Sequence, residues 1–262
     1  RMNKSGFTLV EVAIVIVIIG ILVAGVLGGQ ELVEQSKIKA LSSQLEGYSA
    51  AANIFRIKYG YLPGDLPRSR ASPYGLTSPH VDYSAIPDGN GRYNYIVPLT
   101  SCQSGFSTHS TSILGEPQFF FIHLIDAKLI KEPTLTSYGG GFVRIGTHLP
   151  FSSYGGGGIG IATLCSNRHA FVIGVQTSAT VGAHNFGTGG ILQGSVNAEQ
   201  ASMYDLKFDD GIPARGTILS IRSGPYLNTG SSFNSCVTDG TGMVYNITNT
   251  STACSLSIEG KF

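Results

Sequence analysis

Glu11 is the residue whose position in the sequence raises the sharpest chemical question. It is the last charged side chain before Val12–Gln30, a run of 19 residues without formal charge. A carboxylate within a membrane helix costs about 2.5–3.5 kcal/mol on insertion scales, so it should have a partner or a function. Phe7 stands four residues before it and follows Gly6. Glu11 is therefore the first candidate for a functional charge.

A cluster of acidic residues in the last quarter of the chain could hold a cation. Asp205, Asp209 and Asp210 form the densest such cluster, and oxygen-rich loops bind calcium. The string departs from an EF-hand, because Lys207 occupies a ligand position and Asp210 replaces the turn glycine. The alternative is a turn in which Asp209 and Asp210 accept hydrogen bonds from backbone amides before Gly211. A weaker candidate of the same kind consists of Asp88 and Asn90.

The apolar run that follows Glu11 is the element that would position it. Its 19 residues would cover roughly 28 Å as a helix, at ~1.5 Å per residue, which is about one hydrocarbon core. Arg1 and Lys4 precede the run and favour a cytoplasmic N-terminus with an outward C-terminal domain. The run is thus a candidate membrane span.

The residues around the start of this run form a recognisable processing site. Residues 4–11 read Lys-Ser-Gly-Phe-Thr-Leu-Val-Glu, which resembles the processing site of type IV prepilins and of type II secretion pseudopilins. The resemblance implies cleavage between Gly6 and Phe7 by a prepilin peptidase, N-methylation of Phe7, and assembly into a helical filament. A secretory signal is cut after its apolar region, whereas this site precedes it, so the run would be retained. In related pilins the acid at the position of Glu11 neutralises the N-terminal amine of a neighbouring subunit, which here is the amine of Phe7.

One long helix is predicted for residues 8–58. Beyond the apolar run, apolar residues recur at steps of three and four residues, the period of a helix. They are Leu32, Val33, Ile38, Leu41, Leu45, Tyr48, Ala52, Phe55 and Tyr59. The helix should stop in residues 60–67, which hold two glycines and two prolines. As the resemblance implies, the first half would lie in lipid or in a filament core, and the second half would pack on a head domain.

The rest of the chain is predicted to form an α+β head with a mainly antiparallel sheet and one or two short helices. The helices are expected over about 116–131 and near 198–206, the second with Asn197 and Gln200 in a capping box. We expect His123 at the edge of the first helix's apolar face, in a structural role. Strands are predicted at 142–146, 159–164, 169–175 and 215–222. Residues 68–115 are predicted as a packed loop, and the C-terminal 40 residues as an irregular region with room for one more hairpin.

Two further segments extend the resemblance. Residues 59–65 and 204–216 are similar to recurrent segments of larger pilin-like proteins. The resemblance is therefore strong over residues 4–67, moderate over 204–216, and architectural elsewhere.

The chain has four cysteines, whose spacing suits disulfides better than a metal site. They are Cys102, Cys165, Cys236 and Cys254, and none lies in a C-x-x-C pair. An even count in an exported domain favours disulfides, with three possible pairings. The short separation of Cys236 and Cys254, together with the C-terminal disulfide that related pilins often carry, favours this pair. Cys102 would then pair with Cys165.

Composition and motifs exclude several classes of function. The net charge of +1 becomes −1 once residues 1–6, with Arg1 and Lys4, are removed, so there is no electrostatic case for a nucleic-acid site. The sequence has no G-x-x-x-x-G-K-[ST] phosphate loop and no G-x-S-x-G nucleophile motif. We therefore predict a non-enzymatic protein without a cofactor, calcium being the one possible ligand.

These observations together predict a filament subunit. Residues 1–6 would be the leader, 7–30 the transmembrane or filament-core half of the helix, and 31–262 the periplasmic or extracellular head. The resemblance implies a pilin of a type IV pilus, serving adhesion, motility or DNA uptake, that starts in the inner membrane and ends in a surface fimbrium. Its partners would be copies of itself or other pilins, the prepilin peptidase and the pilus assembly platform. The alternatives are a pseudopilin of a type II secretion system, in a periplasmic pseudopilus, and a membrane-anchored binding module that never polymerises.

Overall fold

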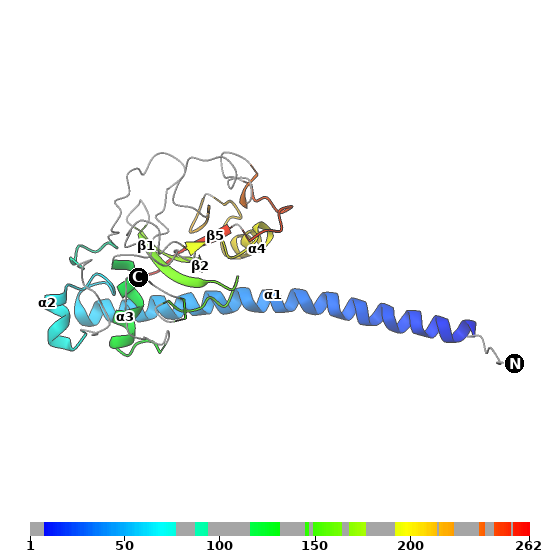
Figure 1. Cartoon of the computed structure of the whole chain (residues 1–262), viewed down its shortest axis with the longest axis horizontal. Helices are drawn as coiled ribbons and strands as arrows, with labels where there is room; N and C mark the ends of the chain where they lie inside the picture. Colours follow the sequence, from blue (N-terminus) through cyan, green and yellow to red (C-terminus); the bar gives the residue numbers. More distant parts are fainter. Residues whose placement is uncertain are drawn as a thin grey trace, which may run out of the picture.

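The computed structural model describes residues 8–76, 87–93, 116–131, 145–146, 149–163, 168–176, 192–213, 215–222, 236–238, 244–252 and 254–262. Within these ranges, a long helix carries a head near its C-terminal end and projects far beyond it at the other end (Figure 1). The head combines an antiparallel sheet with short helices. The fold is therefore α+β and pilin-like, as the sequence predicts.

Helix α1, Leu9–Tyr59, has the two-part character predicted for it. It begins after Thr8 and ends at Gly60, which adopts a φ of 77° that favours glycine. Its apolar N-terminal half is exposed, since none of its apolar window is buried by the described part of the chain. Its C-terminal half packs against the head with buried side chains that include Ile38, Leu41, Leu45, Tyr48, Ala52 and Phe55. The change from the exposed half to the packed half follows the predicted helical stripe.

The sheet has a central path of four antiparallel strands and one short additional strand. The strands are β1 (Gly158–Thr163), β2 (His169–Gln176), β3 (Leu192–Gln193), β4 (Ile218–Arg222) and β5 (Cys254–Glu259). Their order is β1-β2-β5-β4, and β3 pairs with the end of β2. Three predicted strands are confirmed within a few residues. Of the predicted strand 142–146 only residues 145–146 are described, and Ile145 makes an isolated bridge with Leu149.

Strand β5 is the main departure from the sequence prediction. The C-terminal region was expected to be irregular with room for a hairpin, yet β5 lies between β2 and β4 in the sheet. In β5, Leu256 pairs with Ile173 and Ile258 pairs with Phe171. Ser255 and Ser257, which alternate with these two apolar residues, are also buried. Because serine is typical of turns, this alternation of serine with apolar residues did not indicate a central strand.

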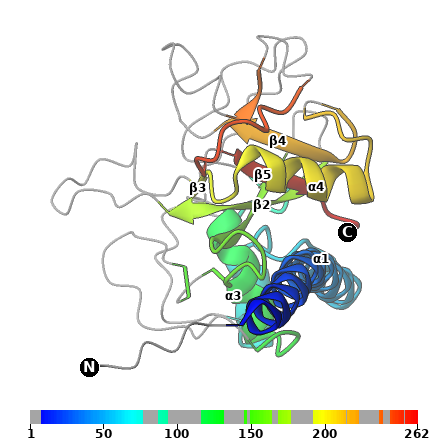
Figure 2. The ribbon, with the colours of Figure 1, turned by 90° about the vertical axis from the view of Figure 1, so that its right-hand side faces the viewer.

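One face of the sheet packs on α1 and on α3 (Phe119–Asp126). Figure 2 shows these two helices side by side beneath the sheet. Phe171 of β2 contacts Tyr48 of α1 and Phe120 of α3, with ring centroids 6.2 and 6.0 Å apart. Phe262 closes the same cluster, 5.5 Å from Phe120. An aromatic core therefore joins the helix, the sheet and the C-terminal residues.

Four short helical segments complete the head. They are α2 (Arg68–Ala71), η1 (Ser72–Tyr74), η2 (Glu116–Gln118) and α4 (Ala198–Phe208). The capping box of α4 is confirmed: the Asn197 side chain accepts from the Gln200 N–H at 2.8 Å, and the Gln200 side chain accepts from the Asn197 N–H at 3.2 Å. The predicted helix over 198–206 thus extends two residues further.

The helix predicted over 116–131 is shorter than expected. A 3₁₀ turn precedes α3, which ends at Asp126. Lys128 has a φ of 59°, its N–H donates to the Ile125 carbonyl at 2.8 Å, and the Leu129 N–H donates to the Leu124 carbonyl at 2.9 Å. These two bonds form a Schellman motif, which stops a helix even though no glycine marks the place.

Replacing Lys128 with glycine should stabilise the head. A non-glycine residue in the left-handed region costs about 1 kcal/mol, and glycine removes that cost. We expect the free energy of unfolding to rise by about 1 kcal/mol, measured by urea unfolding of the full chain in mild detergent. Lys131→Gly is the control, because Lys131 is exposed but has no positive φ. An equal gain in both variants would contradict the explanation.

His123 lies at the centre of the head, so its predicted position at the edge of the apolar face was wrong. The ring is fully buried, and its Nδ1 accepts a hydrogen bond from the Gly64 N–H at 2.8 Å. It also stacks parallel to the ring of Phe55, with centroids 5.8 Å apart. Burial lowers the pKa of His123 to about 4. The residue is structural, as predicted, and joins α3 to the loop that follows α1.

Candidate functional site

Glu11 caps the helix that carries it. Its Oε2 accepts hydrogen bonds from the Thr8 N–H at 2.7 Å and from the Thr8 hydroxyl at 2.8 Å. In return, the Glu11 N–H donates to Thr8 Oγ1 at 3.3 Å. This is a capping box, which was not predicted although the spacing Thr8-x-x-Glu11 is its sequence signal. The carboxylate therefore points back toward the residues before Thr8; Gly6 and Phe7 themselves lie outside the described residues.

The apolar half of α1 is a large uncovered surface. Among the described residues, α1 is the one helix long and apolar enough to cross a membrane, and its apolar window is entirely exposed. The exposed side chains include Val12, Ile14, Ile16, Ile19, Leu22 and Val26. Soluble monomers seldom expose so large a contiguous apolar surface. A surface of this kind suits burial in lipid or against other protein.

The acidic residues predicted as a calcium site do lie together. Carboxylate oxygens of Asp205, Asp209 and Asp210 come within 4.8 Å of one another. Asp209 accepts from the N–H groups of Thr217 and Ile218, the latter at 2.8 Å. Asp210 accepts from the Ile212 N–H at 2.9 Å. These bonds hold the turn between α4 and β4, as in the alternative interpretation, although the donating amides follow Gly211 and do not precede it. Calcium binding stays a prediction.

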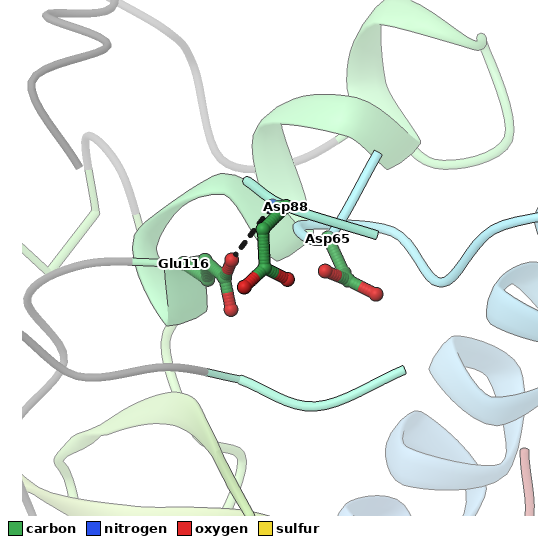
Figure 3. A group of neighbouring side chains, drawn as sticks. All are labelled: Asp65, Asp88 and Glu116. Carbon is green, nitrogen blue, oxygen red and sulfur yellow. Dashed lines mark hydrogen bonds between the residues drawn. The ribbon is translucent and has the colours of Figure 1, made fainter. Parts of the chain in front are cut away.

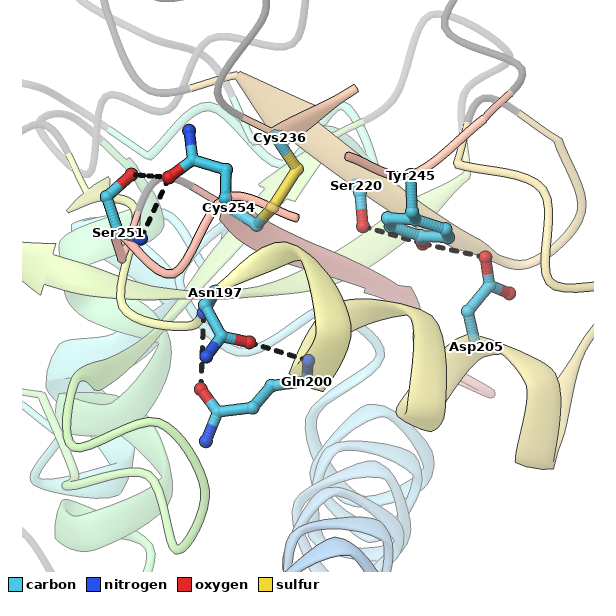
Figure 4. The surroundings of a disulfide bond; sticks show 9 residues. Asn197, Gln200, Asp205, Ser220, Cys236, Tyr245, Ser251 and Cys254 are labelled. Carbon is cyan, nitrogen blue, oxygen red and sulfur yellow. Dashed lines mark hydrogen bonds between the residues drawn. A yellow bond between two sulfur atoms is a disulfide. The ribbon is translucent and has the colours of Figure 1, made fainter. Parts of the chain in front are cut away.

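Asp205 belongs to a buried chain of side-chain hydrogen bonds. Figure 4 shows the Tyr245 hydroxyl between Asp205 and Ser220. It donates to Asp205 Oδ2 at 2.7 Å and lies 2.8 Å from Ser220 Oγ. Burial raises the pKa of Asp205 to about 6, although the bonds from Tyr245 and the Gly211 N–H oppose this shift. The chain links α4, β4 and the segment 244–252.

Tyr245→Phe should destabilise the head most strongly at alkaline pH. Above pH 6 Asp205 is ionised, and a hydrogen bond to a charged group is worth about 1.5–3 kcal/mol. We expect a loss of about 2 kcal/mol at pH 8 and a smaller loss at pH 5, where the carboxyl is protonated. Urea unfolding at the two pH values measures both. The Asp205→Asn background should reduce the difference; an undiminished loss in that background would show that Tyr245 acts through packing alone.

A second group of carboxylates comes from three separate segments. Figure 3 shows Asp65, Asp88 and Glu116 next to one another. One carboxylate oxygen from each lies within 4.8 Å of the other two. Asp65 accepts from the N–H groups of Gly89 and Gly91 at 2.8 and 2.7 Å, and Glu116 accepts from the Asp88 N–H at 3.1 Å. Burial raises the pKa of Asp65. These contacts organise the turn at residues 87–93.

Of this second group, the sequence indicated only Asp88 and its neighbour Asn90. The Asp88 carboxylate accepts from the Asn90 N–H at 2.9 Å and from its side-chain amide at 2.8 Å, so this pair forms a local turn. Asp65 and Glu116 were not predicted as its neighbours, because no local spacing connects three such distant positions.

The predicted disulfide between Cys236 and Cys254 is present, with Cα atoms 5.2 Å apart (Figure 4). It ties the segment 236–238 to the first residue of β5. Val237 pairs with Tyr245 in a small antiparallel bridge just beyond it. The other predicted pair, Cys102 and Cys165, lies outside the described residues.

Comparison with known proteins bears on the N-terminal segment. A family described as a prokaryotic N-terminal methylation motif matches residues 1–27. Searches of curated proteins and of solved structures gave no match. The matched range includes Gly6, Phe7, Glu11 and most of the apolar run. Over residues 1–27 the chain therefore carries the prepilin-type motif that type IV pilins and pseudopilins share.

Proposed function

We propose that this chain is a structural subunit of a type IV pilus. The single observation that carries the proposal is the apolar half of α1, most of which lies within the match to a methylation motif and which is exposed. A surface of this kind suits a segment that leaves lipid for a protein-lined filament core. The motif itself points to a structural protein of the pilin type, a class that is usually non-enzymatic.

Each of the three parts of the chain has its own role in the proposed processing and assembly. Residues 1–6 act as a leader that a prepilin peptidase removes after Gly6, and Phe7 is then methylated. Residues 7–30 hold the precursor in the inner membrane with a cytoplasmic N-terminus, and later line the filament core against copies of the chain or other pilins. The pilus assembly platform would make this transfer. Residues 31–262 form the head on the outer surface, where adhesion, motility or DNA uptake would act.

Glu11 would set the register between subunits. Processing creates an amine at Phe7, directly before the Thr8 cap that holds the Glu11 carboxylate. In a filament core with little water, this carboxylate and the amine of a neighbouring subunit would neutralise each other. The Glu11 carboxylate, which is costly to place in lipid, would thereby make a specific contact between two subunits of the filament.

Shearing filaments from native cells tests the proposal. Mass spectrometry of the sheared fraction should find an abundant N-terminal peptide that begins with methylated Phe7. Processed chain confined to the envelope, with exoprotein release depending on it, would instead assign it to a type II secretion pseudopilus. A chain that retains Gly6 in every fraction would overturn the filament proposal and leave a membrane-anchored module.

A further inference from the structure

The level at which α1 leaves the bilayer follows from its length. A hydrocarbon core of about 30 Å takes about 20 helical residues, which from Val12 ends near Glu31. Leu32 and Val33 are exposed and extend the apolar surface slightly further. The headgroup layer, about 5–7 Å thick in each leaflet, would therefore begin close to residue 33.

Helix α4 lies at this level of the head. Gln200 donates to Glu34 Oε1 at 3.0 Å, and Lys207 donates to Gln35 Oε1. Residues seven positions apart on α4 thus contact adjacent residues of α1, so α4 crosses α1 instead of following it. Figure 2 looks along α1 from its N-terminal end and shows α4 running across the front of the head. If α1 spans a bilayer, α4 faces the membrane surface.

The C-terminal end of α4 exposes the chemistry of an interfacial anchor. Leu206 is 65% exposed and Phe208 42% exposed, whereas Ala201 and Tyr204 of the same helix are buried in the head. Lys207 is exposed between the two apolar side chains, with its Nζ 6.0 Å from the centroid of the Phe208 ring. Successive residues of a helix project ~100° apart, so Leu206 and Phe208 flank Lys207 on either side of the helix end, and residues of these types are typical of contact with headgroups.

Two nearby carboxylates limit the depth of such a contact. Glu31 of α1 and Glu199 in the first turn of α4 are both exposed and carry charge that must stay hydrated. The headgroup layer is wet enough to keep them so, whereas the hydrocarbon core is not.

We propose that Leu206, Lys207 and Phe208 rest in the headgroup layer of the bilayer that α1 spans, before the chain enters a filament. This inference rests on the membrane-anchored precursor of the proposed function. The head is then held by two points, the helix and the end of α4, so its orientation on the membrane is fixed. Assembly must lift this end of α4 from the lipid as it extracts α1.

The test uses the absence of tryptophan from the sequence. Leu206→Trp introduces a single tryptophan into the full chain, which is reconstituted in phosphatidylcholine vesicles and excited at a wavelength that tyrosine does not absorb. We expect a blue-shifted emission that is quenched by lipid brominated near the headgroup end of its chains, and less by lipid brominated near the methyl end. Ile57→Trp is the matched control: it is 85% exposed, yet lies ~33 Å beyond Gln35 along α1, so it should stay unquenched. Phe208→Trp, a milder exchange, should repeat the Leu206→Trp result.

A third probe separates failure of this inference from failure of the proposed function. Ile16→Trp lies within the apolar half of α1, ~6 Å inside the start of the core at Val12, and should be quenched by lipid brominated along its chains. If Ile16→Trp is quenched but Leu206→Trp and Phe208→Trp are not, the contact of α4 with lipid is wrong and the membrane helix stands. If Ile16→Trp is not quenched either, α1 does not span the bilayer and the proposed precursor is wrong. The emission of Leu206→Trp could instead shift further to the blue as the protein-to-lipid ratio rises, without being quenched by brominated lipid. This result would mean that a second copy of the chain covers α4, and it would overturn the inference.

Discussion

Glu11→Gln is expected to remove the chain from sheared filaments while leaving its helix and its processing intact. Glutamine keeps an oxygen that can accept both hydrogen bonds from Thr8, so the capping box is retained. It loses the negative charge that would face the Phe7 amine of a neighbouring subunit. An uncompensated charge in a buried site costs about 3–5 kcal/mol. Incorporation should therefore fall by roughly 100-fold or more, measured by mass spectrometry of sheared against membrane fractions.

Thr8→Ala is the matched control for Glu11→Gln. It removes the cap but keeps the carboxylate, and loss of an N-cap costs only about 1 kcal/mol. Its incorporation should stay close to that of the wild type. If Thr8→Ala is excluded from filaments as strongly as Glu11→Gln, the requirement is for the start of the helix, and the proposed charge contact is wrong.

The free energy of unfolding should decrease as the pH falls from 6.5 toward 4. Burial holds the folded pKa of His123 at about 4, against 6.5 as its ordinary value, so in this interval the unfolded chain binds a proton that the folded chain does not. The stability that the neutral ring contributes is fully present above pH 6.5 and is lost progressively below it. Because each pH unit in this interval costs up to about 1.4 kcal/mol, the loss reaches about 3 kcal/mol near pH 4. His169, with its pKa lowered to about 4 by burial and by Arg56, should add a similar loss.

His123→Asn isolates the contribution of His123. Its side-chain oxygen can take the place of Nδ1 as acceptor for the Gly64 N–H, but it does not titrate. The variant should be less stable at pH 7, and its stability should depend less on pH by up to about 1.4 kcal/mol per pH unit. Asp65 and Asp205 have raised pKa values, so their protonation stabilises the folded chain as the pH falls and opposes the effect of His123. Because both carboxyls are present in the variant and in the wild type, the difference between the two curves reports on His123. Parallel curves from urea unfolding in detergent would contradict the assignment.

Local signals in the sequence were sufficient for some elements and not for others. The long apolar stripe and the glycines and prolines after Tyr59 predicted α1, and Asn197 with Gln200 predicted the start of α4. The end of α3 was not predictable in this way, because Lys128 occupies a position where glycine is the usual signal. Strand β5 was missed because its serines are buried by neighbours that are distant in sequence.

The candidate sites also differ in whether a local signal in the sequence was sufficient to predict them. Glu11 was recognisable because a charge beside a long apolar run is anomalous wherever the chain folds. The disulfide between Cys236 and Cys254 closes a short segment, so sequence separation already favoured it. By contrast, Asp65, Asp88 and Glu116 meet only through the tertiary fold. The contact of Asp205 with Tyr245 likewise depends on how the C-terminal segment returns over α4.

The position of β5 has a consequence for the order in which the head can fold. Synthesis runs from α1 to β5, so the strand that joins β2 to β4 is the last of the described elements to leave the ribosome. Until it arrives, β4 has no described strand to pair with, and Phe262 is missing from the aromatic core. The four-stranded path of the sheet therefore cannot be complete until β5 has been synthesised, long after the apolar half of α1.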